Sequence, residues 1–204
     1  MHRPDMSQTP STSTPAAADE VSPGFEVRPL LATDPIAPIT ALLHRAYSIQ
    51  VRSGMMPLAG RQSVEMTRQR CYRGQTFVAL TRHAGTPSAD FAGRLVGTIL
   101  FQEREDAAFP PWFLRAEVTH FSQFAVEPGL QRSGVGRLLL QRVEEATLDM
   151  GCTELALSMA EPDLALRAYY ERRGYREVQT WQWPYTNYQS LILSKTLASP
   201  GEGP

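Results

Sequence analysis

The sequence predicts a mixed α+β or α/β domain built on a largely antiparallel sheet, and three observations carry this prediction. Segments with the period-two alternation of strands outnumber segments with helical spacing. Residues 76–83, 93–104 and 116–126 are strand-like and follow one another with only turn-rich connections, which indicates an antiparallel meander. Helical segments are interleaved with the strands, so the two kinds of element share one domain.

The first elements follow from local patterns. "FEVRPL" alternates like a strand, and residues 35–50 carry apolar side chains at helical spacing. Residues 61–74 predict a second helix that ends at Gly74. The meander comes next.

The second half predicts two more helices and three strands. From residue 135 a helix shows one apolar face, and Gly151 can end it in a left-handed cap. The expected face consists of Val135, Leu138, Leu139, Val143, Ala146, Thr147 and Met150. A strand over 153–159 and a short helix from Asp163 that stops at Gly174 follow, and strands over 176–183 and 188–197 close the domain.

Composition limits the class of protein. The 204 residues are 42% hydrophobic and 20% charged with a formal net charge of -1, as expected for one soluble domain that binds small molecules. Cys71 and Cys152 have neither disulfide-framework nor zinc-site spacing, so no metal is expected. No stretch has the length of a membrane span or the apolar core of a signal peptide, so a cytoplasmic location without membrane contact is expected.

Both ends are predicted to be disordered. Residues 1–23 are rich in Ser, Thr, Pro and Ala, residues 198–204 have the same character, and the domain is expected to span 24–197. Arg3 is the only lysine or arginine before Arg28, which removes the electrostatic basis for a nucleic-acid-binding arm.

The stretch "QRSGVG", residues 131–136, lies between a predicted strand and a predicted helix. Gly134 and Gly136 leave backbone amides uncovered at a helix N-terminus, which suits a phosphate, although a tight turn without a ligand uses the same residues. The loop is not a P-loop because Arg137 follows Gly136, and Leu139 replaces the third glycine of a dinucleotide fingerprint.

Two blocks resemble the GNAT superfamily of N-acetyltransferases. The first is Val126-Glu127-Pro128 followed by the glycine loop, and the second is Asp163, Leu166, Tyr170, Gly174 and Tyr175 at the family's spacings. The resemblance implies a splayed, mostly antiparallel sheet of about seven strands with helices on both faces. It also implies an acetyl-CoA site, whose expected residues are Phe124, Ala125, Val126, Gln131, Arg132, Ser133, Gly134, Val135, Gly136 and Asp163. Asp163 departs from the family's usual Asn, which puts that contact in doubt.

The same resemblance suggests the groups that move protons. Tyr170 holds the position of the phenol that protonates the departing thiolate, with Tyr169 as its rival. His120 lies eleven residues before Gln131, where several members carry the base, and alternation places it on one strand face with Ser122 and Phe124 unless a bulge intervenes. Glu103 and Glu105 are alternative bases that could act through water.

The acceptor pocket is expected from the first helices and the last strand pair. Met55, Met56 and Leu58 suggest an apolar wall, while Tyr47, Arg52 and Arg61 could meet an anionic group of the acceptor. Trp181 and Trp183 could stack on a ligand or cover the seam of a homodimer.

Two functions remain open at this point. The first is an acyl-CoA-dependent N-acyltransferase that moves acetyl to a small-molecule or protein amine. The second is a CoA-binding sensor or interaction protein that has kept the fold and lost the reaction. The sequence carries no pattern that identifies the acceptor.

Overall fold

A computed structural model describes residues 24–82, 91–103 and 108–197. The predicted tails at 1–23 and 198–204 lie outside the described residues, as does Glu105. The first half of the described chain contains β1 (Phe25–Pro29), α1 (Ile36–Ala46), α2 (Ser48–Arg52), η1 (Leu58–Gly60), α3 (Val64–Arg73), β2 (Gln75–Thr81), α4 (Phe91–Arg94) and β3 (Leu95–Phe101). The second half contains η2 (Pro111–Leu114), β4 (Val118–Val126), η3 (Pro128–Leu130), α5 (Val135–Asp149), β5 (Glu154–Ala160), α6 (Leu164–Glu171), β6 (Arg176–Trp181) and β7 (Ser190–Thr196).

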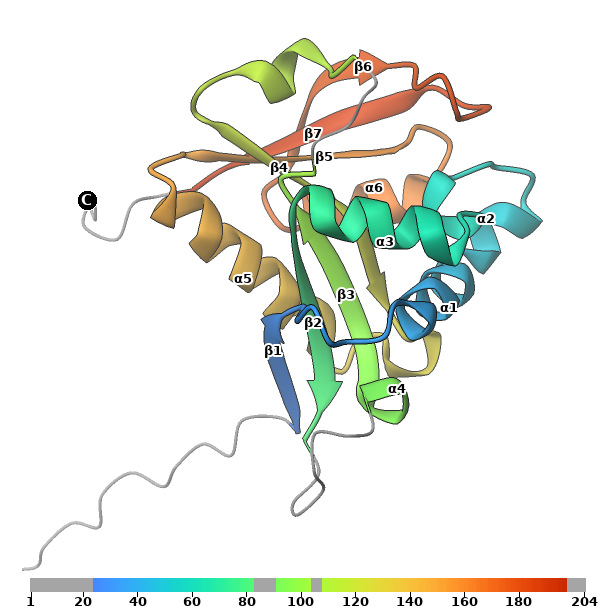
Figure 1. The fold of residues 1–204 in the computed structure, drawn as a ribbon. Helices are drawn as coiled ribbons and strands as arrows, with labels where there is room; N and C mark the ends of the chain where they lie inside the picture. Colours follow the sequence, from blue (N-terminus) through green and yellow to red (C-terminus); the bar gives the residue numbers. More distant parts are fainter. Residues whose placement is uncertain (1–23, 83–90, 104–107, 198–204) are drawn as a thin grey trace, which may run out of the picture.

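The strands form one seven-stranded sheet in the order β1-β2-β3-β4-β5-β7-β6. All neighbouring pairs are antiparallel except β4 and β5, which are parallel. In Figure 1, β5 and β7 cross the upper part of the molecule at a steep angle to β2 and β3. The predicted mixed fold with a splayed, mostly antiparallel sheet is therefore confirmed.

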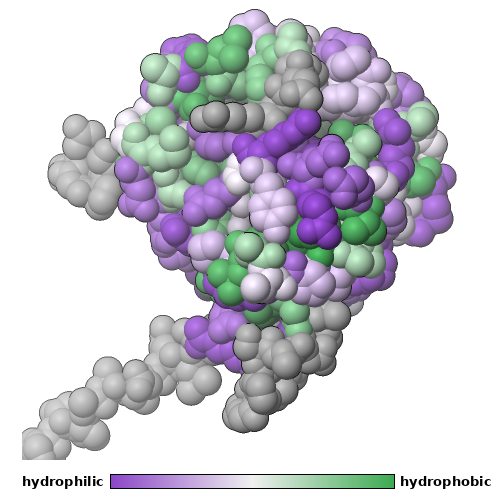
Figure 2. All heavy atoms as spheres, in the orientation of Figure 1, coloured by the Kyte–Doolittle hydropathy of each residue, from purple (hydrophilic) through white to green (hydrophobic). Residues whose placement is uncertain are grey.

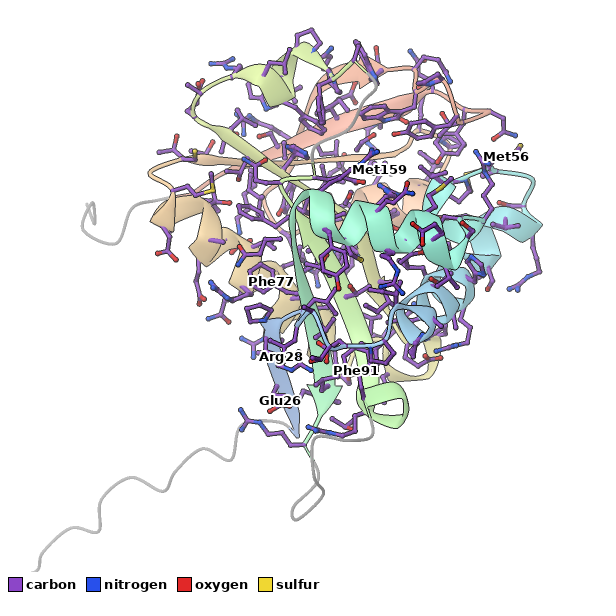
Figure 3. The ribbon with its side chains drawn as sticks, viewed as in Figure 1. Glu26, Arg28, Met56, Phe77, Phe91 and Met159 are labelled. Atoms are coloured by element: carbon purple, nitrogen blue, oxygen red, sulfur yellow. The ribbon has the colours of Figure 1, made fainter. Side chains whose placement is uncertain are left out.

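Helices cover both faces of the sheet, and alternate side chains of β2 pack into two different cores, one on each face. Phe77 and Ala79 pack in the cluster that contains the apolar side of α5, whereas Val78 and Leu80 pack in the cluster that contains α1. Figure 3 shows Phe77 in the middle of the sheet, near α5. Figure 2 shows the side covered by α3, where hydrophilic residues prevail across the middle of the surface.

The predicted helices and strands are present, with local differences. The helix expected over 35–50 divides at Tyr47, and the helical turn α4 precedes β3 without having been predicted. Two positions of the expected apolar face of α5 are wrong: Leu138 is only half-buried, and Met150 is 57% exposed because it lies past the last helical residue. Gly151 has a φ of 72°, as its predicted left-handed cap requires.

Candidate active site

The glycine loop ends in a helix N-terminus with free amides. Gly134 is the N-cap of α5 with a φ of 97°, a left-handed conformation that glycine adopts without steric strain. No side chain caps this helix, and its first turn contains no acidic residue. The first intrahelical bond runs from the Leu138 amide to the Gly134 carbonyl at 3.1 Å, so the amides before it have no acceptor within the helix. This geometry suits an anion.

The second glycine of the loop is explained by close packing. A Cβ atom at Gly136 would lie 3.3 Å from Cζ of Phe124 and 3.4 Å from the hydroxyl oxygen of Tyr169. The structure therefore places the hydroxyl of Tyr169, the rival of Tyr170 in the sequence analysis, beside the loop. Arg173 lies over the Tyr169 ring, 3.6 Å from its centroid.

The strands β4 and β5 separate next to this loop. Their register covers only Val118–Phe121 of β4, so the rest of β4 has no partner strand on that side. Figure 1 shows the two strands diverging there. The part of β4 that has no partner on the β5 side includes the backbone of Phe124, Ala125 and Val126. The Phe124 carbonyl accepts a hydrogen bond from the Tyr47 hydroxyl at 3.3 Å.

A bulge changes which side chains share a face of β4. Gln123 has a φ of 48°, and the register with β3 shifts between the pairs Leu100↔Ser122 and Thr98↔Ala125. As a result Phe124 packs against the core under α5, whereas Ser122 bonds to Glu103 on the other side. The bulge that the sequence analysis allowed for is therefore present, and Phe124 does not share a face with His120 and Ser122, because alternation does not continue through a bulge.

His120 is buried with one nitrogen free. Its Nε2 lies 3.1 Å from the carbonyl oxygen of Glu103, and since a carbonyl only accepts, Nε2 carries the hydrogen. Nδ1 then keeps its lone pair and has no hydrogen-bond partner among the described residues. The ring stacks on Phe113 with 4.6 Å between centroids. Burial lowers the pKa of His120 below the usual imidazole value, although the Glu103 carbonyl and carboxylate act in the opposite direction.

Glu103, an alternative base in the sequence analysis, belongs to a buried ion pair. Arg70 donates to both of its carboxylate oxygens at 2.5 Å, and the Ser122 hydroxyl donates to one of them at 2.8 Å. Arg70 also donates to Gln62, and the Gln62 amide donates to the Gln123 side chain at the bulge. This network ties α3 to the bulge of β4.

Tyr170 lies on the other side of Phe121 from His120. Its ring contacts Phe121 at 6.2 Å and Tyr175 at 5.4 Å between centroids. Burial raises the pKa of Tyr170 well above the usual phenol value, and neighbouring Tyr47 contributes to the same shift. Burial likewise raises the pKa of Tyr47 to about 12. Both phenols are therefore protonated at neutral pH and can donate.

Asp163 is occupied by contacts within the protein. One carboxylate oxygen accepts from the Leu166 amide at 3.0 Å and so caps α6, and the other accepts from the Gln50 side chain at 2.7 Å. In this structure its visible role is to fix the start of α6 and to join it to α2.

A cavity of about 110 Å³ lies beside His120. Residues from both diverging strands line it, among them Phe121 on β4 and Met159 on β5; Figure 3 labels Met159. Its other aromatic walls come from elements far apart in the sequence: Tyr47, Phe109, Phe113, Trp183, Tyr185 and Tyr188. Sequence reasoning had named Tyr47 and Trp183 for this region and had missed the other four.

Not all the residues expected at the acceptor pocket reach this cavity. Leu58 lines it, whereas Met55, Met56, Arg52 and Arg61 do not. Met56 is 46% exposed, and Figure 3 places it at the outer edge of the loop after α2.

The described residues contain neither a metal-binding cluster nor a membrane-spanning helix. Within residues 24–82, 91–103 and 108–197, no group of three or more potential ligands could hold a metal ion. None of the helices in those ranges has the length and apolar character needed to cross a bilayer.

Comparison with known proteins identifies the family. The model of the acetyltransferase (GNAT) family matches residues 45–175, which contain the glycine loop, β4 and α6. No curated protein matches the chain significantly in sequence.

Solved structures share the fold at low sequence identity. The ribosomal-protein-S18-alanine N-acetyltransferase from Escherichia coli is 18% identical, with a TM-score of 0.57 over 88% of this chain and 98% of that one. A GNAT family acetyltransferase from Elizabethkingia anophelis with acetyl-CoA bound is 16% identical, with a TM-score of 0.57 over 86% and 100%. An acetyltransferase from Streptococcus agalactiae is 18% identical, with a TM-score of 0.60 over 85% and 99%. The chain therefore belongs to the acetyltransferase (GNAT) family, whose members transfer acetyl from acetyl-CoA.

Proposed function

We propose that the protein is an acyl-CoA-dependent N-acyltransferase that moves acetyl from acetyl-CoA to a primary amine by direct attack. One observation carries this proposal: a buried, neutral histidine with an unused lone pair lines a cavity between the diverging strands β4 and β5. An unpartnered buried nitrogen costs about 1–3 kcal/mol, which favours a ligand that satisfies it during the reaction.

The donor would bind along β4 and the glycine loop. Its pyrophosphate accepts from those amides of the loop Gln131–Gly136 that do not already donate to Pro128 and Leu130, and from the start of α5, where the helix dipole adds positive potential. Arg132 and Ser133 belong to the same loop. The pantetheine arm follows the backbone of Phe124–Val126, and Asp163 contributes by holding α6 in place.

The reaction needs two proton transfers, and we propose one group for each. The amine lone pair attacks the thioester carbonyl carbon, and His120 Nδ1 accepts the nitrogen's proton as the C–N bond forms. The C–S bond then breaks, its electron pair goes to sulfur, and the Tyr170 hydroxyl protonates the thiolate. Solvent returns a proton to Tyr170 and removes one from His120, so the products are an N-acetylamine and CoA.

Glu103 is a weaker candidate for the base than His120. Arg70 and Ser122 already donate hydrogen bonds to its two carboxylate oxygens. A carboxylate engaged in this way is better suited to holding β3, β4 and α3 together.

The buried free cysteines Cys71 and Cys152 fit the reducing, cytoplasmic setting that we also propose.

The test is thiol release from acetyl-CoA with a panel of primary amines, followed by mass spectrometry of the products. Acetylation of at least one amine, with release above the rate without amine, is expected. CoA binding without release for any small amine, peptide or protein N-terminus would contradict the proposal and favour a CoA-binding sensor.

A further inference from the structure

The cavity beside His120 is walled by aromatic rings. Trp183 and Tyr185 stack with 5.5 Å between centroids and 18° between planes, and Phe109 meets Trp183 edge-on at 6.4 Å. Phe113 closes another side by stacking on His120. Ring faces and edges bind apolar groups, and ring faces also attract ammonium groups.

Three hydroxyl groups around the cavity are engaged within the protein. Ser122 donates to Glu103, Ser158 accepts from the Trp183 indole at 2.9 Å, and Thr186 donates to the Tyr188 carbonyl at 3.0 Å. Six fully buried side-chain polar atoms have no partner in the described part of the chain, and only His120 Nδ1 belongs to a cavity-lining residue. At Ser122, Ser158 and Thr186, a ligand rich in hydroxyl groups would meet side chains that are already engaged, and it would replace fewer of its hydrogen bonds to water.

The charges around the cavity do not favour an anionic ligand. Among the described residues that line it, none is lysine or arginine, and Glu103 is the one carboxylate. Arg70 is committed to Glu103, and Arg61, which is outside the lining, donates to the Tyr185 carbonyl at 2.5 Å. An acceptor carboxylate or phosphate would therefore be buried without a dedicated partner.

The size and position of the cavity fit the apolar body of a small amine. Its volume of about 110 Å³ is of the same order as the ~150 Å³ cavity that takes up benzene in an engineered protein. A larger hollow of about 650 Å³ shares Phe109, Phe113 and His120, but no described β5 residue lines it. Only the smaller cavity includes residues of both diverging strands and so adjoins the expected thioester.

We propose that the acceptor is a small primary amine whose body is a hydrocarbon, aryl or branched alkyl, of roughly four to eight carbons, without a carboxylate or phosphate. The amine nitrogen would approach His120 Nδ1 while the body contacts Trp183, Tyr185 and Phe113. This inference rests on the proposed N-acyltransferase function, and it goes further by naming the class of substrate.

Matched pairs of acceptors test the inference. Isoamylamine and leucine share one side chain, as do 2-phenylethylamine and phenylalanine, and each pair differs by an α-carboxylate. We expect kcat/KM for the amine of each pair to exceed that for the amino acid by about 10²-fold or more, because the carboxylate would lose its hydration. Ethanolamine should also be a poor acceptor. Equal or better turnover of leucine, phenylalanine or ethanolamine would overturn the inference and leave the N-acyltransferase function standing.

Variants of the cavity wall provide a second test. Trp183→Leu and the less buried Tyr185→Leu should each raise KM for isoamylamine or 2-phenylethylamine by ~10- to 100-fold, as expected for the loss of an aromatic contact. The value of kcat should change little. Trp181→Leu is the matched control, because Trp181 adjoins Trp183 but does not line the cavity. If neither wall variant changed KM more than Trp181→Leu did, the acceptor would bind elsewhere.

Direct binding separates failure of this inference from failure of the proposed function. Calorimetric titration of CoA-saturated protein, and of protein without CoA, should show isoamylamine binding more tightly than leucine. Binding with this preference but without turnover would support the cavity's selectivity and contradict the acyltransferase proposal. No detectable binding of either apolar amine would overturn the substrate class, whatever the outcome of the wider amine panel.

Discussion

Replacing His120 by alanine tests the proposed base through both rate and pH dependence. A positioned general base contributes ~10²- to 10⁴-fold, which corresponds to about 2.7–5.5 kcal/mol of activation free energy. His120→Ala should therefore lower kcat by that factor. The substitution also removes the bond to the Glu103 carbonyl and the stack on Phe113, at an expected cost in folding stability of about 1.5–3 kcal/mol.

The pH profile distinguishes a catalytic from a structural role. The base must be neutral, so kcat should rise with pH through the pKa of His120 and then level off. Because burial lowers this pKa, the midpoint should lie below the ~6.5 of a free imidazole. Burial raises the pKa of Tyr170 well above its usual value. The Tyr170 hydroxyl therefore stays protonated near neutral pH, and its deprotonation should not lower the rate there.

The assay is thiol release at saturating acetyl-CoA and acceptor, measured over a range of pH for the wild type, His120→Ala and His120→Gln. His44→Ala is the control, because His44 is exposed and should leave the acid limb in place. If the acid limb is unchanged in folded His120→Ala, the base is Glu103, Glu105 or water, and His120 has only a packing role.

Three further substitutions have defined outcomes. Gly134→Glu should abolish CoA binding, since it places a side chain at a φ of 97° and a negative charge at the α5 N-terminus; unchanged affinity by calorimetry would refute this placement of the pyrophosphate. Tyr170→Phe should lower kcat on the order of 10²-fold while sparing acetyl-CoA affinity, and a larger kcat loss in Tyr169→Phe would reverse the assignment. Arg70→Met should lower the free energy of unfolding by about 3–5 kcal/mol in urea titrations, since it leaves a buried carboxylate unpaired. Arg115→Met, in an exposed ion pair, should change it by less than ~1 kcal/mol; similar effects of the two would show that the Arg70 pair is not buried in solution.

The parts of the fold that local chemistry determines were predictable. The helix α5, which follows the glycine loop, ends at Asp149, two residues before Gly151, and a turn contains Gly174; both glycines have positive φ. Apolar runs between turn-rich segments located the central strands, because a strand that is buried on both faces, such as β3, is apolar along most of its length. The family motifs added the splay between β4 and β5, which no local pattern indicates.

The cavity walls could not be predicted in the same way. Phe109 and Phe113 come from the connection between β3 and β4, whereas Tyr185 and Tyr188 come from the turn between β6 and β7. No periodicity relates these segments, and they meet only because β7 pairs with β5 and so brings the turn before β7 beside the end of β5. Trp183 was recognised as a residue that could stack on a ligand, but its partners depended on the tertiary structure.

The bulge of β4 shows how one irregular residue connects the fold to the proposed chemistry. Gln123 adopts a left-handed φ that costs a non-glycine residue roughly 1–2 kcal/mol, so other contacts must hold it there. The Gln62 side chain provides one, and Arg70 links Gln62 to Glu103 behind it. With the bulge in place, Phe124 turns toward Gly136 and the glycine loop while His120 and Ser122 stay beside Glu103. The buried network therefore explains how the last residues of β4 can face the proposed donor site while the residues before them face the cavity beside His120.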